Sequence, residues 1–384
     1  MRALCWAGDG HLAVRQVPDP ELRNDQDAIV RVRCSATSGA DLPLLAGGSP
    51  TFAVGDVLGH EFVGDVVEVG RRVHRHRVGD RVVVAATVSC GACWYCRRGL
   101  PAACDNGSVG PTVDDPAWGE SVAGCFGRPP AGGGLPGGHA EYVRVPYADV
   151  GAFGVPEPVP DDRALFASAA APAGWLGAEL GGVGPGDVVA VWGAGAVGQL
   201  AARAARLLGA DRVVVVDRHP DRLRFARWYA EADTLDHANA DVLAELRELS
   251  GGRGPDVCVE AVGADGGPPR SRAERFLGAG RPPDAVREAV YACRKGGTVV
   301  VLGDRTDFAD AFPLGVLTRR GVTLHGSRPQ AHRHIPMLLG RMARDELRTE
   351  HLATHHLPLD RAADGYALFR DRADGCLRAV FSPG

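Results

Sequence analysis

Hydrophobic and polar residues alternate in the N-terminal part of the chain. A period of two runs through residues 28–34, 61–69, 80–84 and 139–145, and Gly and Pro punctuate the intervening segments. This spacing places apolar side chains on one face of a strand, so it predicts a half-buried β-sheet. We therefore expect the chain to begin with an all-β lobe.

The pattern changes at about Pro185, where continuous apolar runs begin to alternate with helical segments. Strands are predicted at 187–192, 212–217, 256–260 and 298–302, and helices at 196–208, 221–230 and 241–249. Strands that alternate with helices are typical of a parallel sheet with crossover connections. The fold class expected for this part is α/β, with a doubly wound Rossmann sheet.

The C-terminal part no longer alternates strands and helices regularly. Helices are predicted near 331–345 and 360–370, and an apolar strand at 377–381 is expected to rejoin the β lobe. We therefore predict a discontinuous β domain of residues 1–152 and 325–384. A cofactor domain of residues 153–324 is inserted between its two parts.

Charge and composition narrow the class of protein. The 384 residues carry a formal net charge of -4, which argues against a basic surface for nucleic acid or anionic lipid. No apolar stretch is long enough for a membrane span, and the first residues lack a secretory apolar core. We expect a cytoplasmic protein whose 10 cysteines are mainly reduced.

Four cysteines cluster in the segment 85–110. Their spacing is Cys90-x2-Cys93-x2-Cys96-x7-Cys104, on a loop that contains Gly91 and Gly99. Four thiolates at such spacing can surround one Zn²⁺ tetrahedrally and leave no open coordination position, which predicts a structural zinc. A disulfide pair and a redox site are the alternatives.

A glycine-rich turn joins the strand 187–192 to the helix 196–208. Its residues Gly193, Gly195 and Gly198, with Ala196 and Val197 at the helix start, form a GxGxxG motif. Glycines let the backbone approach a pyrophosphate, and the helix N-terminus supplies unpaired N–H donors. The motif predicts a dinucleotide site, and a tight strand–helix packing turn is the alternative.

Acidic and basic residues follow the next strand. Asp217 ends that strand, about 20 residues beyond the glycines, where a carboxylate binds the ribose hydroxyls of NAD. Arg218 and Arg222 come directly afterwards and could instead receive a 2′-phosphate. NAD is the expected cofactor, and NADP is not excluded.

Several motifs resemble the zinc-containing medium-chain alcohol dehydrogenases over essentially the whole chain. The resemblance rests on the four-cysteine lobe and on residues 59–61 (Gly-His-Glu), 138–142 (Gly-His-Ala-Glu-Tyr) and 184–187 (Gly-Pro-Gly-Asp). Residues 145–149 and 172–178, and the insertion after 259–263, are closest to the glutathione-independent formaldehyde dehydrogenases. In those relatives the insertion covers the adenine end of the cofactor, which here would involve Val262 and the residues up to Pro283.

The resemblance implies an NAD(P)-dependent oxidoreductase with a GroES-like catalytic domain. It implies one structural zinc per chain, a small-molecule substrate and a homodimer or homotetramer. The family's catalytic zinc is held by a Cys in a Cys-Gly-Thr-Asp-Leu-His segment, by the His of Gly-His-Glu, and by an acidic residue before a Pro-x-Gly turn.

The chain departs from the family at this metal site. The matching segment reads Ser38-Gly-Ala-Asp41-Leu-Pro43, and residues 168–172 (Ser-Ala-Ala-Ala-Pro) contain no acidic residue. Among the three ligand positions only His60 is retained, with Glu61 beside it. One imidazole and a neutral hydroxyl hold Zn²⁺ poorly, so we predict that the catalytic zinc is lost.

Without that metal, other groups must handle the proton. Ser38, Asp41, His60, Glu61 and His139 are candidates for proton delivery or for hydrogen bonds to substrate. Alternatively, Asp41 caps a helix, His60 and Glu61 form a structural pair, or a rescued metal site uses Cys34 with His60 and one of the two carboxylates.

A pocket without a Lewis acid favours substrates that are already electrophilic. We expect hydride transfer to or from an activated C=C, C=N or C=O of a specialised metabolite, in a pocket to which Trp175, Leu176 and Trp118 contribute. The alternatives are a conventional zinc-dependent dehydrogenase with unusual ligands and a non-catalytic NAD-binding protein.

Overall fold

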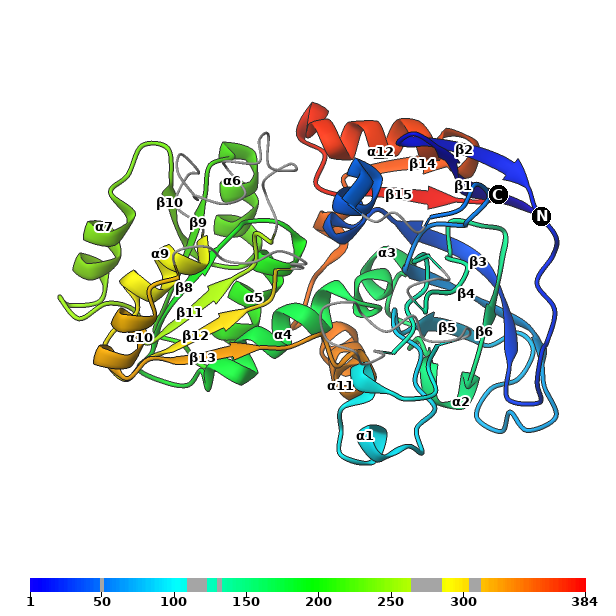
Figure 1. Cartoon of the computed structure of the whole chain (residues 1–384), viewed down its shortest axis with the longest axis horizontal. Coiled ribbons are helices and arrows are strands. Elements are labelled where there is room, and N and C mark those ends of the chain that lie inside the picture. The colour runs from blue at the N-terminus through cyan, green and yellow to red at the C-terminus, as the bar shows by residue number, and fades with distance from the viewer. Residues whose placement is uncertain (49–51, 109–122, 130–132, 264–284, 304–311) are drawn as a thin grey trace. The chain divides into compact units, whose positions relative to one another are not determined.

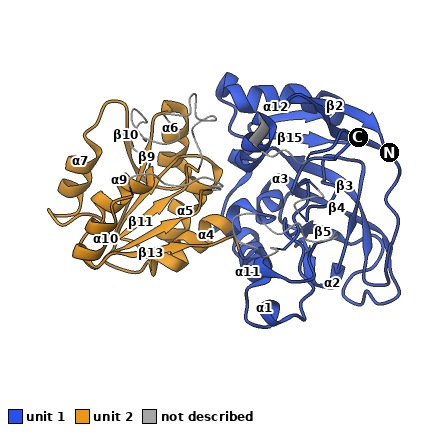
Figure 2. Cartoon of the chain, in the orientation of Figure 1, with its two compact units in different colours: residues 1–172, 330–384 blue, residues 173–329 orange. Residues whose placement is uncertain are grey.

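The computed structural model describes residues 1–48, 52–108, 123–129, 133–263, 285–303 and 312–384 (Figure 1). Two compact units are present (Figure 2): unit 1 comprises residues 1–172 and 330–384, and unit 2 comprises residues 173–329. Residues 153–172, which the sequence pattern placed in the cofactor domain, belong to unit 1. They include helix α3 (Asp161–Ala164), which contacts β3 (Ala28–Ala36).

Unit 1 is built on two β-sheets. A hairpin pairs β1 (Arg2–Gly8) with β2 (His11–Gln16). The larger sheet has the order β14 (His355–Pro358), β15 (Ala379–Ser382), β3, β4 (Glu61–Val69), β5 (Arg81–Val84) and β7 (Ala152–Gly154), and β6 (Tyr142–Val145) also pairs with β3. Strand β15 pairs antiparallel with β3, which confirms that the C-terminal strand rejoins the β lobe.

Alternating burial explains the position of β3 in this sheet. Val30 and Val32 are buried, whereas Arg31 and Arg33 point to the exposed face. The helices of unit 1 are α1 (Trp94–Arg97), α2 (Ala148–Gly151), α3, α11 (Ala331–Ala343) and α12 (Ala362–Asp371). Helix α12 packs on β14 and β15 and brings C-terminal side chains to the core of the unit.

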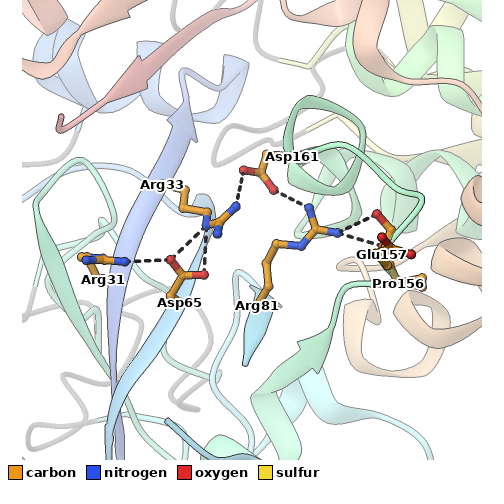
Figure 3. A network of polar contacts seen from close by, with 7 residues as sticks. All are labelled: Arg31, Arg33, Asp65, Arg81, Pro156, Glu157 and Asp161. Carbon is orange, nitrogen blue, oxygen red and sulfur yellow. Dashed lines mark hydrogen bonds and ion pairs between the residues drawn. The ribbon is translucent and has the colours of Figure 1, made fainter. Parts of the chain in front are cut away.

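A chain of ion pairs covers the polar face of β3, β4 and β5 (Figure 3). Asp65 on β4 pairs with Arg31 and Arg33, and Asp161 on α3 joins Arg33 to Arg81 on β5, with N–O distances of 2.9–3.3 Å. Asp161 has two cationic partners from two strands, so this network fixes the start of α3 against the sheet. In the segment that follows, residues 165–172, Ser168 donates to the carbonyl oxygen of His60 and Ala170 N donates to Glu61.

Unit 2 contains a six-stranded parallel sheet. Its order is β10 (Asp233–Asp236), β9 (Arg212–Asp217), β8 (Val188–Trp192), β11 (Val257–Glu260), β12 (Thr298–Val301) and β13 (Thr323–Gly326). Counted within the unit, this is the order 3-2-1-4-5-6 of a doubly wound nucleotide-binding sheet. The predicted α/β fold class is confirmed.

Helices precede the first strand of unit 2 and connect the later ones. They are α4 (Ala170–Gly181), which crosses the division between the units, and α5 (Ala196–Leu207), α6 (Pro220–Tyr229), α7 (Val242–Leu249), α9 (Ala285–Ala292) and α10 (Leu314–Arg320). The strand order reverses between β8 and β11, so the glycine turn after β8 lies at the topological switch point, where such folds bind ligands. Among the described residues, no helix combines the length and hydropathy needed to cross a bilayer.

Candidate functional site

The four predicted zinc ligands converge in unit 1. The Sγ atoms of Cys90, Cys93, Cys96 and Cys104 all lie within 4.8 Å of one another. Gly91 and Gly99 have positive φ angles of 72° and 74°, which lets the loop curl around the sulfurs. A set of four converging thiols is the donor set of a closed structural zinc site, so the cluster fits one Zn²⁺.

Hydrogen bonds favour the thiolate of Cys90, whereas burial raises the pKa of the Cys96 and Cys104 thiols. Cys90 Sγ accepts from the backbone N–H of Cys93 at 3.3 Å and from Asn106 Nδ2 at 3.3 Å. Burial alone raises the pKa of Cys90, but these donors and the N–H of Ala92 lower it to about 6. Donors that stabilise the sulfur charge also orient the sulfur lone pairs for a cation.

The glycine turn of unit 2 contains one open position between two closed ones. A Cβ on Gly198 would lie 1.8 Å from the carbonyl oxygen of Gly193, and a Cβ on Gly193 would lie 2.9 Å from that of Ala261. At Gly195 the nearest atom to such a Cβ is Arg222 Nη1, at 4.0 Å. The outer glycines therefore serve packing, and the backbone at Gly195 is free to approach a phosphate.

Polar groups near this turn suit an anionic dinucleotide. Asp217 Oδ2 accepts from the N–H of Ala194 at 2.6 Å, and Oδ1 accepts from the N–H of His219 at 2.9 Å. Both bonds fix the carboxylate, and each oxygen keeps a lone pair for a ribose hydroxyl. The Arg222 guanidinium lies beside the turn, and Val262 lies next to Gly193.

Asp41 and His60 meet in the core of unit 1. Ser38, Asp41 and the short 3₁₀ turn Gly39–Asp41 form a capping box: Asp41 Oδ2 accepts from Ser38 N at 2.9 Å, and Ser38 Oγ accepts from Ala40 N at 3.4 Å. Asp41 Oδ1 lies 3.3 Å from His60 Nδ1. Both residues are buried. Within the described residues, His60 Nδ1 is a buried atom without a hydrogen-bond partner, so it lies within ion-pair distance of Asp41 but not in hydrogen-bond geometry. The other ring nitrogen, Nε2, has no hydrogen-bond partner there either.

Charge keeps the buried Asp41 ionised. Burial alone would raise its pKa, but His60, Arg128 and His139 act in the opposite direction and hold the pKa of Asp41 well below its usual range. An ionised carboxylate at Nδ1 favours the imidazole tautomer that carries its proton on Nδ1.

Glu61 lies in a different environment from His60. Its Oε1 accepts from Ala170 N at 2.9 Å, and its Oε2 lies 3.4 Å from Arg378 Nη1. Glu61 and Arg378 are both buried, so their charges compensate each other inside the unit.

The remaining predicted ligands of the catalytic metal do not join His60. Ser168 Oγ donates to the carbonyl oxygens of His60 and Val84, and burial raises the pKa of the Cys34 thiol. In the described part of the chain, the cysteine quartet is the only group of three or more Cys, His, Asp or Glu side chains close enough to share a metal ion.

Comparisons with known proteins agree with both units. The alcohol dehydrogenase GroES-like domain model matches residues 24–157, and the zinc-binding dehydrogenase model matches residues 196–267. The uncharacterized zinc-type alcohol dehydrogenase-like protein AdhB of Bacillus subtilis is 32% identical over 100% of both chains. The chain belongs to the zinc-type alcohol dehydrogenase family.

Further relatives extend this zinc-type alcohol dehydrogenase assignment. The alcohol dehydrogenase of Thermus sp. ATN1 superimposes with a TM-score of 0.87 at 31% identity, covering 100% of both chains. The glutathione-independent formaldehyde dehydrogenase of Pseudomonas aeruginosa is 35% identical over 68% of this chain and 65% of its own length. The chain is therefore an oxidoreductase of the medium-chain dehydrogenase class, as the sequence motifs predicted.

For this zinc-type dehydrogenase, the sequence motifs did not identify three groups of these sites, two of which lie far from any motif. Tyr366, on helix α12, donates to Asp41 Oδ2 at a distance of 2.8 Å. Arg378, in the segment before β15, compensates the negative charge of Glu61. Asn106 donates to Cys90 just beyond the fourth cysteine, where an amide two residues after a ligand was a usable signal. Trp175 and Leu176 are buried in α4, whereas Trp118 and residues 264–283 of the predicted insertion lie outside the described residues.

Proposed function

We propose that this protein is an NAD(P)-dependent oxidoreductase that holds one structural zinc and transfers hydride without a catalytic metal. The observation that carries the proposal is the donor set around His60. One imidazole nitrogen faces Asp41, and the hydroxyls of Ser38 and Ser168 are engaged by backbone groups. This set offers Zn²⁺ too few anionic or imidazole ligands, so it does not fit a catalytic zinc.

The cofactor proposal rests on unit 2. Gly195 and the first N–H groups of α5 would receive the pyrophosphate, Asp217 a ribose and Arg222 further negative charge. A bound nicotinamide dinucleotide supplies or accepts the hydride. Val262 and Arg218 stay predictions as cofactor contacts, and the Asp217 carboxylate favours NAD over NADP because it would repel a 2′-phosphate.

The proton proposal rests on unit 1. The charge of the Asp41 carboxylate, 3.3 Å from His60 Nδ1, favours a proton on that nitrogen, so Nε2 acts as general base toward a substrate O–H or, once protonated, as general acid. Ser38 orients Asp41 through its backbone N–H. Glu61, paired with Arg378, accepts from Ala170 N and so holds the backbone next to His60. Of the four catalytic candidates, His60 is thus the proton-exchanging group and the others position it.

The substrate proposal follows from the missing Lewis acid. A general acid alone stabilises developing oxyanion charge less than a metal ion does, which favours substrates whose C=C, C=N or C=O bond is already activated. A small specialised metabolite of this type is the proposed substrate class. A cytoplasmic location and a homodimer or homotetramer stay predictions.

Metal content tests the proposal. Purified wild-type protein should contain about one zinc per chain, and His60→Gln should contain the same amount, because His60 holds no metal. About two zincs per chain, with one lost in His60→Gln, would establish a conventional catalytic zinc instead.

A turnover panel tests the enzymatic part. NADH and NADPH oxidation should be followed with enals, iminium ions and quinones, in wild type and in His60→Gln. We expect turnover on one of these classes that falls about 100-fold or more in the variant. NADH binding without turnover on the whole panel would favour the non-catalytic alternative.

A further inference from the structure

A chain of buried polar side chains continues beyond Asp41, away from His60. Tyr366 donates to Asp41 Oδ2, and its own oxygen lies 2.9 Å from His139 Nε2. The opposite nitrogen of that ring, Nδ1, lies 2.8 Å from Ser35 Oγ. Three segments, β3, the loop before β6 and helix α12, thus contribute to one line of hydrogen bonds that ends on the Asp41 carboxylate.

The protons on this line point in one direction. The Tyr366 hydroxyl has one proton and gives it to Asp41, so its oxygen must accept from His139 Nε2–H. Burial lowers the pKa of His139 to about 4, which leaves the ring neutral with a single N–H and its Nδ1 free to accept from Ser35. Every dipole along the line is therefore aimed at the carboxylate, and such chains polarise one another.

The line does not lead to water. Ser35, His139 and Tyr366 are 1%, 0% and 3% exposed. A proton taken up at Asp41 could not leave by this route, so the line is not a proton exit. What it can do is fix the position and the charge of the carboxylate.

Packing makes this arrangement rigid. A Cβ on Gly59, the residue before His60, would lie 2.5 Å from the ring of His139, so only glycine fits between ring and backbone. The Tyr366 ring packs on Phe381 with a centroid separation of 5.9 Å. The ring of Tyr366 is therefore held independently of its hydroxyl, and a Phe at this position would keep the packing.

Other charges face the same groups. Arg128 donates to the carbonyl oxygen of Ala40 at 2.9 Å and favours the ionised form of Asp41. Arg378 and Arg128 also act on Tyr366, against the burial and the Asp41 charge that together raise the pKa of its hydroxyl well above the usual value. Tyr366 therefore stays protonated and stays a donor.

We propose that Tyr366 is a positioning residue: its hydroxyl, backed by His139 and Ser35, fixes the Asp41 carboxylate that selects the Nδ1-protonated tautomer of His60. This inference rests on the proposed role of His60 as the proton-exchanging group. It assigns a function to a C-terminal helix that contributes no ligand or motif of its own. Loss of the hydroxyl would leave Oδ2 with the Ser38 N–H as its remaining donor, which would loosen the carboxylate and let the His60 tautomers mix.

Nitrogen NMR of the histidine rings tests this proposal on the resting, zinc-loaded full chain. Protein labelled with ¹⁵N-histidine is measured at pH 7.5, and the His60 signals are identified by their absence in His60→Gln. Wild type should show His60 mainly with its proton on Nδ1, and His139 with its proton on Nε2. In Tyr366→Phe the ratio of Nδ1–H to Nε2–H forms of His60 should fall about threefold or more, because a hydrogen bond to a charged group is removed.

Further variants show how large the change in the His60 tautomer ratio should be. Asp41→Asn should give the largest change, and Ser35→Ala a smaller change than Tyr366→Phe in the same direction, which also provides a readout should Tyr366→Phe unfold. Tyr291→Phe, which removes an exposed hydroxyl in unit 2, should leave His60 unchanged.

Two failures are distinguishable. A His60 tautomer ratio that is the same in wild type, Tyr366→Phe and Ser35→Ala would overturn the positioning role and leave the proposed function intact. Signals of a metal-bound His60 ring that return to those of a free ring after chelation would overturn the proposed function itself.

Discussion

The cysteine lobe and the Asp41–His60 site are built in opposite ways. All four sulfurs of the lobe come from one loop, between residues 90 and 104. The Asp41–His60 site draws its groups from β3, the 3₁₀ turn, the start of β4, the loop before β6 and helix α12. A site whose ligands all lie in one loop is retained or lost as a single sequence motif. A site assembled from several elements can change its chemistry by single substitutions while the fold persists.

The hydrogen bonds of the cysteine lobe and of the Asp41–His60 site also differ. In the lobe, N–H groups donate to sulfurs that keep lone pairs directed at a common centre. Around His60, the Ser168 hydroxyl is used up on backbone carbonyls, and Asp41 Oδ2 already accepts from Ser38 and Tyr366. The first environment fits a cation site, and the second is the one for which we propose an imidazole without a metal.

The largest effect is expected from breaking the local site. Cys104→Ser should lower the zinc content about tenfold or more, because a neutral hydroxyl replaces a thiolate and a three-ligand site is open to water. The lobe has little apolar core of its own, so the thermal unfolding midpoint should fall as well. Zinc per chain and the midpoint are the measurements.

Cys125→Ser is the control for this variant. Cys125 is half-buried and lies outside the quartet, so its substitution should keep the zinc content of wild type. Equal zinc loss in both variants would show that general destabilisation, and not ligand removal, empties the lobe.

The phosphate turn is a second local site, and its glycines separate packing from binding. Gly198→Ala should destabilise unit 2 by about 3 kcal/mol or more, because its Cβ would meet the Gly193 carbonyl. Gly195→Ala has room for a Cβ and should fold normally, yet bind NADH about tenfold more weakly. Unfolding midpoints and NADH fluorescence titrations measure the two effects, and equal midpoints for the two variants would contradict the separation.

Features formed within one segment could be predicted from the sequence, whereas features assembled from distant segments could not. The strands, the parallel sheet and the GxGxxG turn are predictable because periodicity and turn residues are local properties. The convergence of the cysteines follows from their spacing. Tyr366 was not predictable: it lies 325 positions from Asp41, on an amphipathic helix where an aromatic residue is expected to be core. Nothing local distinguishes a core tyrosine from one whose hydroxyl reaches a carboxylate.

Glu61 illustrates the limits at a residue that the motif did identify. Its Gly-His-Glu context predicted a catalytic candidate, but its environment depends on Arg378 and Ala170, which the motif does not contain. The identity of a charged residue is visible in sequence, and the partner that neutralises it is not.

The Glu61–Arg378 pair provides an intermediate effect. Arg378→Met should destabilise unit 1 by about 3 kcal/mol, because a buried carboxylate loses its compensating charge. Glu61→Gln in the same chain should recover about half of this loss, since no charge is then buried. Denaturation of the two single variants and the double variant measures the coupling, and simple additivity would mean that the two side chains do not compensate each other.

The smallest effect concerns two histidines with buried ring nitrogens, and its sign is set by their pKa values. Burial lowers the pKa of both His139 and His332 from 6.5 to about 4. As the pH falls, the unfolded chain takes up these protons before the folded chain does. Stability is therefore complete above about pH 6.5 and is lost toward pH 4, by at most about 3 kcal/mol per histidine.

The hydrogen-bond partners of His139 and His332 determine which substitution reveals the loss of stability at low pH. His332 lies on α11 against Phe153, and among the described residues neither of its ring nitrogens has a hydrogen-bond partner. His332→Leu should change stability little at pH 7.5 and raise it by about 1 kcal/mol at pH 5.5, because the proton-binding difference is removed. His139→Leu should lower stability at both pH values, since Ser35 and Tyr366 lose their partner. Urea denaturation at the two pH values compares the variants, and a His332→Leu curve that tracks wild type at pH 5.5 would mean that His332 is protonated in the folded protein.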